Sequence, residues 1–251
     1  MRNMVALETR GLCKSFGALT VADRVDFRLE AGVRHALIGP NGAGKTTLVN
    51  MITGRLAPSA GQVLLAGEDV TRLSQAARVK RGLGRTFQIN TLFGDMTVLD
   101  NVALGVAERD GVGGRLWRPA GAHAQVRAEA LELLATFGLE EDASRRVLDL
   151  PYGKQRLVEI AIALGLKPTV LLLDEPAAGV PSLESHRILG ALERLPANIA
   201  ILIIEHDMDL VFRFAQRITV LVQGEVLCEG APAEIADDPR VRRVYLGERH
   251  G

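Results

Sequence analysis

A single loop constrains this chain more than any other feature of its sequence. Gly39, Gly44, Lys45 and Thr46 fit the pattern G-x-x-x-x-G-K-[ST], directly after the apolar run VRHALI and directly before the helical run TTLVNMITG. Glycines let successive backbone N–H groups surround phosphate oxygens, the lysine reaches the β and γ oxygens, and the hydroxyl ligates Mg²⁺. A glycine-rich turn without a ligand is the alternative, and the flanking strand and helix favour nucleotide binding. The residues that we expect around the nucleotide are Gly39, Pro40, Asn41, Gly42, Ala43, Gly44, Lys45, Thr46 and Thr47.

A second stretch, TVLLLDEPAAG, predicts a buried strand that ends in two carboxylates, Asp174 and Glu175. Open α/β sheets bind ligands at the carboxyl ends of their strands, so Asp174 is predicted on the Mg²⁺ side of the nucleotide that Lys45 holds. Glu175 points elsewhere and is predicted to polarise the attacking water, as general base for hydrolysis of the γ-phosphate. The alternative is a pair of acids that only caps the next turn.

Short apolar runs separated by helical patterns predict a parallel α/β sheet. The runs lie near 33–38, 62–66, 169–173, 200–204 and 218–222. Between about 90 and 165 the apolar spacing is helical throughout, for example at Val126, Ala130, Leu133, Leu134 and Phe137, with Gly138 as the expected C-cap. The sequence therefore predicts an all-helical insertion within an α/β core.

Charge and composition narrow the choice of partner. Among 251 residues, 30 Lys and Arg balance 30 Asp and Glu, which gives a formal net charge of +0. No basic field favours nucleic acid, so no nucleic-acid partner is expected. The sequence shows neither a signal peptide nor the roughly 18 apolar residues of a membrane span, and we expect a cytosolic chain, or a peripheral one through a partner. Cys13 and Cys228 match no metal or redox spacing and are predicted as small core residues.

These motifs together resemble the ATP-binding subunit of an ABC transporter, from about Leu7 to Gly247. The resemblance implies that Phe16, in KSFG, stacks on adenine, where a core phenylalanine is the alternative. Gln88, in GRTFQ, matches the glutamine that joins the core to the helical subdomain and senses Mg²⁺ and the lytic water, unless it is a solvated loop residue. His206, in ILIIEHDM, matches the switch histidine that contacts the γ-phosphate, although a lone histidine after a strand is more often structural.

The same resemblance implies a fold. It is a P-loop NTPase of the RecA-like type, with a parallel sheet, an N-terminal antiparallel β portion and an inserted all-helical subdomain. The chain is expected to form one ABC nucleotide-binding domain over 1–251. Its α/β core would occupy about 1–89 and 166–251, and its helical subdomain, with the signature helix, about 90–165.

The signature motif departs from the family pattern. LPYGK at 150–154 stands where L-S-G-G-Q is usual, so the serine hydroxyl and one glycine are missing. In the family this helix end meets the γ-phosphate held by the opposite subunit of a head-to-tail dimer, which implies nucleotide contacts for Tyr152 and Gly153. Lys154 either supplies a compensating charge or faces solvent.

A tyrosine in the signature is typical of branched-chain amino acid importer ATPases of the Liv type. The stretches DEPAAGV, GRTFQINTLFGDMTVLDNV and GAPAEIADDPRVRRVYLGE resemble that branch too. The resemblance implies a second ABC ATPase subunit, identical or different, two transmembrane permease subunits and, indirectly, a substrate-binding protein, with the chain peripheral on the cytoplasmic face of the inner membrane. Import of branched-chain or related amino acids is expected. Urea, short amides or aromatic acids as cargo, or an ABC ATPase without transport, are the alternatives.

Two prolines lie where the family places dimer-seam residues. Pro151 replaces the signature serine, and Pro181 replaces the Asn or Asp of the D-loop. We expect the ATP site built on this chain's phosphate loop, Glu175 and His206 to hydrolyse ATP, and the site completed by its signature to turn over poorly. The alternative is that proline fits the helix start and turnover is unaffected. Apolar residues beside Gln88 either line a groove for a permease helix or belong to the subdomain core: Ile89, Leu92, Phe93 and Met96.

Overall fold

The computed structural model describes residues 4–86, 92–111 and 120–246. The chain divides into two compact units. The first contains Met1–Leu83, Thr169–Glu175 and Pro196–Gly251, and the second contains Gly84–Pro168 and Pro176–Leu195. The segment after Glu175, which the sequence places in the α/β core, therefore clusters with the helical unit.

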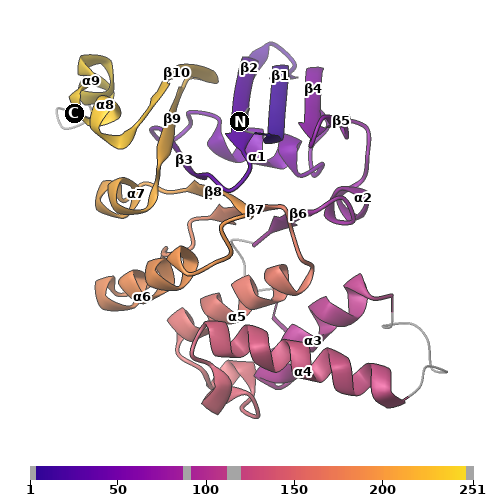
Figure 1. Ribbon diagram of the computed structural model, residues 1–251. Helices are drawn as coiled ribbons and strands as arrows, with labels where there is room; N and C mark the ends of the chain where they lie inside the picture. The colour runs from indigo at the N-terminus through magenta and orange to yellow at the C-terminus, as the bar shows by residue number, and fades with distance from the viewer. Residues whose placement is uncertain (1–3, 87–91, 112–119, 247–251) are drawn as a thin grey trace. The chain divides into compact units, whose positions relative to one another are not determined.

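Two sheets and the helices on them build the first unit (Figure 1). A four-stranded antiparallel sheet has the order β2-β1-β4-β5. Its strands are β1 (Val5–Phe16), β2 (Leu19–Glu30), β4 (Ala60–Leu65) and β5 (Glu68–Asp69). A six-stranded sheet has the order β10-β9-β3-β8-β7-β6. Its strands are β3 (Arg34–Ile38), β6 (Leu83–Arg85), β7 (Val170–Asp174), β8 (Ala200–Ile204), β9 (Arg217–Val222) and β10 (Glu225–Gly230). The helices are α1 (Lys45–Ile52), α2 (Gln75–Val79), α7 (Met208–Phe214), α8 (Pro232–Asp237) and α9 (Pro239–Leu246).

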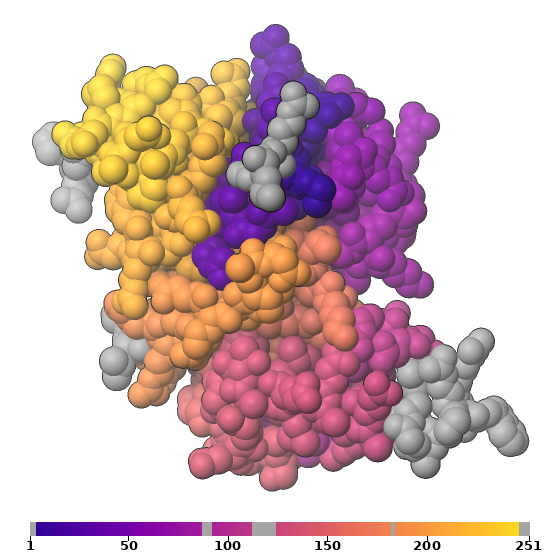
Figure 2. Space-filling model, viewed as in Figure 1, coloured from indigo at the N-terminus to yellow at the C-terminus, as the bar shows by residue number. Residues whose placement is uncertain are grey.

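The hydrophobic pattern explains which strands are central. Every residue of β7 and β8 is buried, as expected for strands of a parallel sheet that is covered on both faces. In β2 burial alternates at Val25, Phe27 and Leu29, so one face packs inward and the other meets solvent. Side chains from both sheets and from α1 share one apolar core. β10 also lies against β2, so strands from the two ends of the chain share one surface (Figure 2).

The second unit is helical. Its elements are α3 (Val98–Arg109), α4 (Ala120–Thr136), η1 (Glu140–Asp142), η2 (Val147–Asp149), α5 (Tyr152–Gly165) and α6 (Ser182–Glu193). α3 packs against α4 and α5 (Figure 1). A side chain at Gly105 of α3 would stand 2.7 Å from the Ile162 carbonyl oxygen, so glycine permits the close approach of α5. Gly138, with φ 66°, ends α4 as the sequence predicts.

One arginine joins three of these helices. Arg109, at the end of α3, donates to both carboxylate oxygens of Glu129 on α4, at 2.6 and 2.8 Å, and to the Gly165 carbonyl of α5 at 2.9 Å. The bidentate pair, together with Lys167, overcomes partial burial and lowers the pKa of Glu129 to about 2. This clamp ties the ends of α3 and α5 to the middle of α4.

The parallel sheet, the antiparallel portion and the helical segment agree with the fold class that the sequence predicts. The prediction for the cysteines is wrong, because Cys13 and Cys228 are only partly buried. Cys228 lies on β10, an edge strand, and the register between β1 and β2 shifts at Cys13. Both side chains therefore keep some contact with solvent.

Candidate functional site

Three neighbouring strands of the first unit end at the same edge of the sheet. β8 lies between β3 and β7, and Ile204 of β8 pairs with Leu37 on one side and with Asp174 on the other. The glycine-rich loop from Gly39 therefore starts at the same sheet edge as Asp174, the last residue of β7. Glu175 follows β7 and His206 follows β8 at this edge. Parallel α/β sheets place their ligand sites at this edge.

The loop needs its glycines for space and for backbone conformation. Gly39, Gly42 and Gly44 have φ of 155°, 78° and 99°. A side chain at Gly39 would lie 2.1 Å from the Leu221 carbonyl oxygen, and one at Gly44 would lie 2.7 Å from that of Val21. Larger residues are excluded at both positions, so the backbone itself lines the loop.

The helix that follows the loop presents an uncapped N-terminus. α1 begins at Lys45 with Gly44 as its N-cap residue, and no side chain caps its first turn. The Lys45 ammonium reaches back along the loop and donates to the carbonyls of Gly39 at 2.5 Å and Pro40 at 3.0 Å. Backbone N–H groups and a cation thus gather where the loop curls, which is the chemistry that holds phosphate. Thr46 is exposed at the same helix start.

The acidic residues beside the loop differ in burial and backbone. Asp174 is 5% exposed, at the end of β7. Glu175 is in the left-handed region with φ 47°, and its N–H donates to the Ile204 carbonyl at 2.9 Å. Residues other than glycine are rare in this conformation. The Asp174 carboxylate and the Thr46 hydroxyl are hard oxygen donors, a set that suits Mg²⁺.

His206 stands next to two carboxylates. Its Nδ1 lies 3.6 Å from Oε1 of Glu175 and 4.0 Å from Oε2 of Glu205. The His206 side chain is 66% exposed, whereas Glu205 is almost fully buried. The Glu205 carboxylate also accepts the His206 N–H at 3.3 Å. Sequence reasoning missed Glu205, although it is a strand-end acid like Asp174 and carries the same signal.

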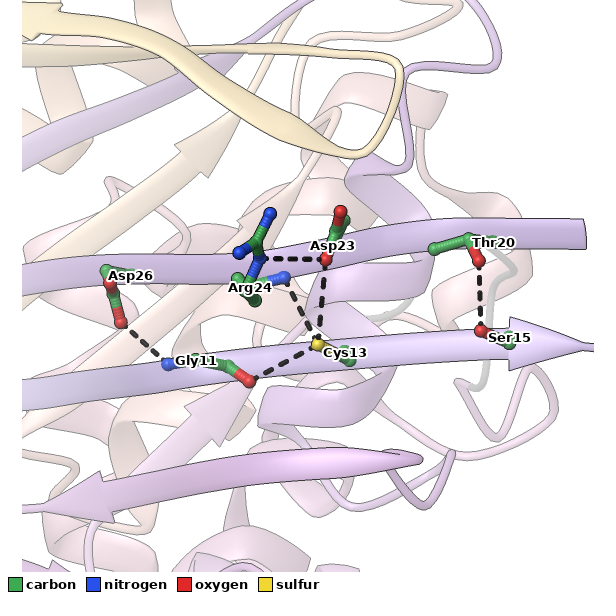
Figure 3. Close-up of polar contacts among 7 residues, drawn as sticks. All are labelled: Gly11, Cys13, Ser15, Thr20, Asp23, Arg24 and Asp26. Atoms are coloured by element: carbon green, nitrogen blue, oxygen red, sulfur yellow. Dashed lines mark hydrogen bonds and ion pairs between the residues drawn. The ribbon is translucent and has the colours of Figure 1, made fainter.

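Phe16 ends β1 and is 52% exposed, so it is not a core phenylalanine. The β1–β2 hairpin that carries it is held by polar contacts along its length (Figure 3). The Cys13 sulfur accepts the Arg24 N–H at 3.2 Å, and the hydroxyls of Ser15 and Thr20 lie 3.1 Å apart. The hairpin therefore fixes the position of the Phe16 backbone.

A glycine that the sequence analysis missed links this hairpin to the phosphate loop. Gly224, in the turn between β9 and β10, donates to the Ala43 carbonyl at 2.9 Å and accepts from the Asp23 N–H at 2.9 Å. Its φ is 83°, and a side chain there would lie 2.5 Å from the Val21 carbonyl oxygen. The Gln-Gly pair between two apolar strands is a turn signal, yet nothing local reveals what the turn touches.

The predicted signature residues lie in the second unit, at the start of α5. Pro151 is the N-cap residue, with φ −55° and ψ 149°, and no side chain caps the helix. Tyr152 is 39% exposed, and the Arg156 guanidinium lies 5.1 Å from the centre of its ring. Gly153 is buried, and the Glu184 carboxylate lies so close that a side chain at Gly153 would stand 2.3 Å from it.

Lys154 is neither a free cation nor a purely solvent-facing residue. Its ammonium donates to the Asp142 carboxylate at 2.5 Å. Burial raises the pKa of Asp142, but Lys154 and Arg145 together outweigh burial, so the pKa lies below its usual value. The Lys154 charge is thus paired with Asp142 within the helical unit.

Gln88 and Ile89 lie outside the described residues. Of their apolar neighbours, Phe93 is 59% exposed, while Leu92 and Met96 are partly buried. The Phe93 backbone is held by Asn101, whose side chain accepts its N–H at 2.9 Å and donates to its carbonyl at 3.0 Å. Phe93 is therefore displayed at the surface of the unit. Among the helices in the described part of the chain, none has the length and apolarity needed to cross a membrane.

Comparison with known proteins shows the family. Residues 22–178 match the ABC transporter family, and residues 225–251 match the family of the branched-chain amino acid ATP-binding cassette transporter. The chain belongs to the ABC transporter family, as one of its ATP-binding ATPase subunits.

Individual relatives place it more closely. It is 40% identical to the high-affinity branched-chain amino acid transport ATP-binding protein LivG of Escherichia coli (strain K12), over 96% of this chain and 98% of that protein. It is 37% identical to BraF of Pseudomonas aeruginosa, which bears the same description, over the same shares of the two chains. A crystal structure of an ATP-binding cassette of an ABC transporter in its ADP conformation matches with a TM-score of 0.85 and 32% identity, covering 97% of this chain and 99% of that one.

Proposed function

We propose that this chain binds and hydrolyses ATP to energise uptake of branched-chain or related amino acids through a separate membrane permease. The observation that carries the proposal is the meeting of the phosphate loop, Asp174 and the Glu175–His206 pair at one sheet edge. Similarity to LivG and BraF over nearly the whole chain supports the class of cargo.

In this proposal the residues divide the work of phosphate binding. The loop N–H groups and Lys45 hold the triphosphate, and Phe16 stacks on the adenine. Thr46 and Asp174 would hold Mg²⁺, with Gln88 as a further ligand, and the metal would neutralise charge on the β and γ oxygens. The nucleotide contacts of the loop are proposed for Gly39, Pro40, Asn41, Gly42, Ala43, Gly44, Lys45, Thr46 and Thr47.

Hydrolysis needs a base close to the γ-phosphate. The Glu175 carboxylate would take the proton of the attacking water, and its rare left-handed backbone supports a functional role at this position. His206 would contact the γ-phosphate while its Nδ1 stays near Glu175. The ring then links the base to the group that is transferred.

The complete enzyme would contain more chains. A second ABC ATPase subunit would supply the opposite half of each ATP site, and Tyr152 and Gly153 would contact the nucleotide held by that partner. Two permease subunits and a substrate-binding protein would complete the importer, and the chain would lie on the cytoplasmic face of the inner membrane. Phe93, exposed beside the Gln88 segment, is a candidate contact for the permease.

The test is reconstitution. The chain is co-expressed with the ATPase and permease subunits encoded beside it. The complex is placed in proteoliposomes together with the substrate-binding protein. ATP-dependent uptake of labelled leucine, isoleucine or valine is expected, and the Lys45→Ala variant should show none. Uptake of urea, an amide or an aromatic acid instead would identify the alternative cargo. Absence of ATP binding by the wild-type chain would contradict the proposal as a whole.

A further inference from the structure

A lysine lies against the aromatic ring at the base end of the proposed site. Lys14 and Phe16 are two residues apart at the end of β1. The Lys14 ammonium lies 5.0 Å from the centre of the Phe16 ring. This distance is within the range in which a cation is attracted to an aromatic face.

The ammonium is also anchored. It donates to the Ala57 carbonyl at 2.8 Å, in the segment between α1 and β4. Two further bonds join the same segment to the end of β1. Ser59 donates its N–H to the Cys13 carbonyl at 2.8 Å, and its hydroxyl accepts the Ser15 N–H at 3.1 Å. Lys14 therefore acts from a fixed point, unlike a lysine that moves freely in solvent.

The anchoring has a consequence for the nucleotide. The segment that holds Lys14 follows α1, and α1 begins at Lys45. The base end and the phosphate end of the site are thus connected through one short helix. On the other edge of β1, the hydroxyl pair of Ser15 and Thr20 closes the hairpin (Figure 3). Hydrogen bonds on both edges of β1 thus hold the backbone around Phe16. The Phe16 ring is half exposed and is contacted by the Lys14 ammonium.

We propose that Lys14 is a positioning residue for the adenine base. The ammonium holds the plane of the Phe16 ring, so the base stacks on a surface that is already ordered and less conformational freedom is lost on binding. This inference rests on the proposed function, because it requires Phe16 to contact the base. It adds a residue that acts through Phe16 and touches no phosphate.

A purely structural role for Lys14 makes different predictions. If the lysine only fastened the 53–59 segment to β1, its loss would disturb the whole site, including phosphate binding. If it acts through the ring, only ligands that carry a base are affected. ATP and inorganic tripolyphosphate, both with Mg²⁺, are therefore the probes that separate the two roles.

The experiment measures affinity of the full chain by calorimetry and by competition with a fluorescent ATP analogue. For Lys14→Met, we expect ATP affinity to fall about two- to fivefold, with tripolyphosphate affinity unchanged. Lys14→Gln keeps a donor for the Ala57 carbonyl but loses the charge, and should behave like Lys14→Met. Lys14→Arg should recover most of the affinity, because a guanidinium also stacks on aromatic rings. Lys80→Met, at an exposed lysine of the same unit, is the matched control and should bind like the wild type.

A double-mutant cycle completes the test. In a Phe16→Ala background, Lys14→Met should produce no further loss of ATP affinity, because the ring through which it acts is gone. In the assembled transporter, Lys14→Met should raise KM for ATP and leave kcat unchanged. An equal loss for tripolyphosphate, an undiminished effect without Phe16, or wild-type affinity in Lys14→Gln would each overturn the inference. Failure of the wild-type chain to bind ATP would instead overturn the proposed function, and this inference with it.

Discussion

Two helices of this chain begin at segments that we propose to contact phosphate, and their starts are built differently. α1 follows a loop with three glycines of positive φ, and the Lys45 ammonium reaches back over that loop. α5 follows a proline, and the lysine of its first turn is paired with Asp142. Both helices begin with backbone N–H groups that an α-helix does not pair within itself. The helix dipole is common to both starts, so the difference between them lies in the residues before and beside each helix.

The largest expected effect is at the sheet edge where α1 and the phosphate loop lie. Glu175→Gln should lower ATP turnover of the assembled transporter about 10²- to 10⁴-fold, because the amide cannot take a proton from water. ATP and Mg²⁺ should still bind, since Lys45 and Asp174 are untouched. Turnover is followed by phosphate release, and binding by calorimetry. Hydrolysis within tenfold of the wild-type rate would show that another group is the base.

The start of α5 is tested by replacing Pro151 with serine, the residue of the usual signature motif. Pro151→Ser should raise turnover of the assembled transporter, because an oriented hydroxyl donor stabilises charge in the transition state by about 2.7–4 kcal/mol in other enzymes. The rise would be limited to the one ATP site that α5 is proposed to complete. Pro151→Ala serves as control, because it removes the proline without adding a donor. An unchanged rate in Pro151→Ser would mean that the extended N-cap conformation of Pro151 already suits the site.

The turn that contacts the phosphate loop can be destabilised at one glycine. Gly224→Ala should lower the free energy of unfolding by about 2–3 kcal/mol, because alanine resists positive φ and its methyl group would press on the Val21 carbonyl. ATP affinity should fall too, since Gly224 bonds to the phosphate loop through Ala43. Gly67→Ala is the matched control: Gly67 has φ 85° and open space around it, so about 1 kcal/mol is expected. Equal losses in urea denaturation would show that the contact with Val21 does not matter.

The smallest effect concerns the ion pair of Arg109 and Glu129 in the helical unit that contains α5. Glu129 has its pKa lowered to about 2 from 4.5, chiefly by the hydrogen bonds from Arg109. A lowered pKa means that the carboxylate contributes stability above about pH 4.5, and that this contribution is lost as the pH falls toward 2. Because Glu129 is partly exposed, about 1 kcal/mol is expected. Glu129→Gln should therefore flatten the fall in unfolding free energy between pH 5 and pH 3.

An acid on the same helix controls for charge alone. Glu132, on α4, is exposed, and Glu132→Gln should leave the pH dependence of the wild type unchanged. A similar flattening in both variants would attribute the effect to net charge and not to the Arg109 clamp. The measurement is urea unfolding at closely spaced pH values.

The parts of the site that follow from local spacing could be predicted from sequence. The phosphate loop and the two acids at the end of β7 depend on residues that are close along the chain, and strand order then brings them together. Contacts between distant segments could not be predicted. Lys14 reaches Ala57, and Gly224 reaches Asp23 and Ala43, because of how the sheets pack and not because of any pattern at those residues. The cysteine prediction failed for the same reason, since burial of a strand residue depends on its neighbours in the sheet.

The left-handed backbone at Glu175 limits which residues can replace it. Valine, isoleucine and threonine would be strained there by their branched Cβ, whereas asparagine and glycine tolerate the conformation. A saturation library at this position would thus lose members to misfolding before catalysis was ever assayed. Variants meant to capture the ATP-bound transporter for imaging should be ranked by backbone tolerance as well as by the charge they remove.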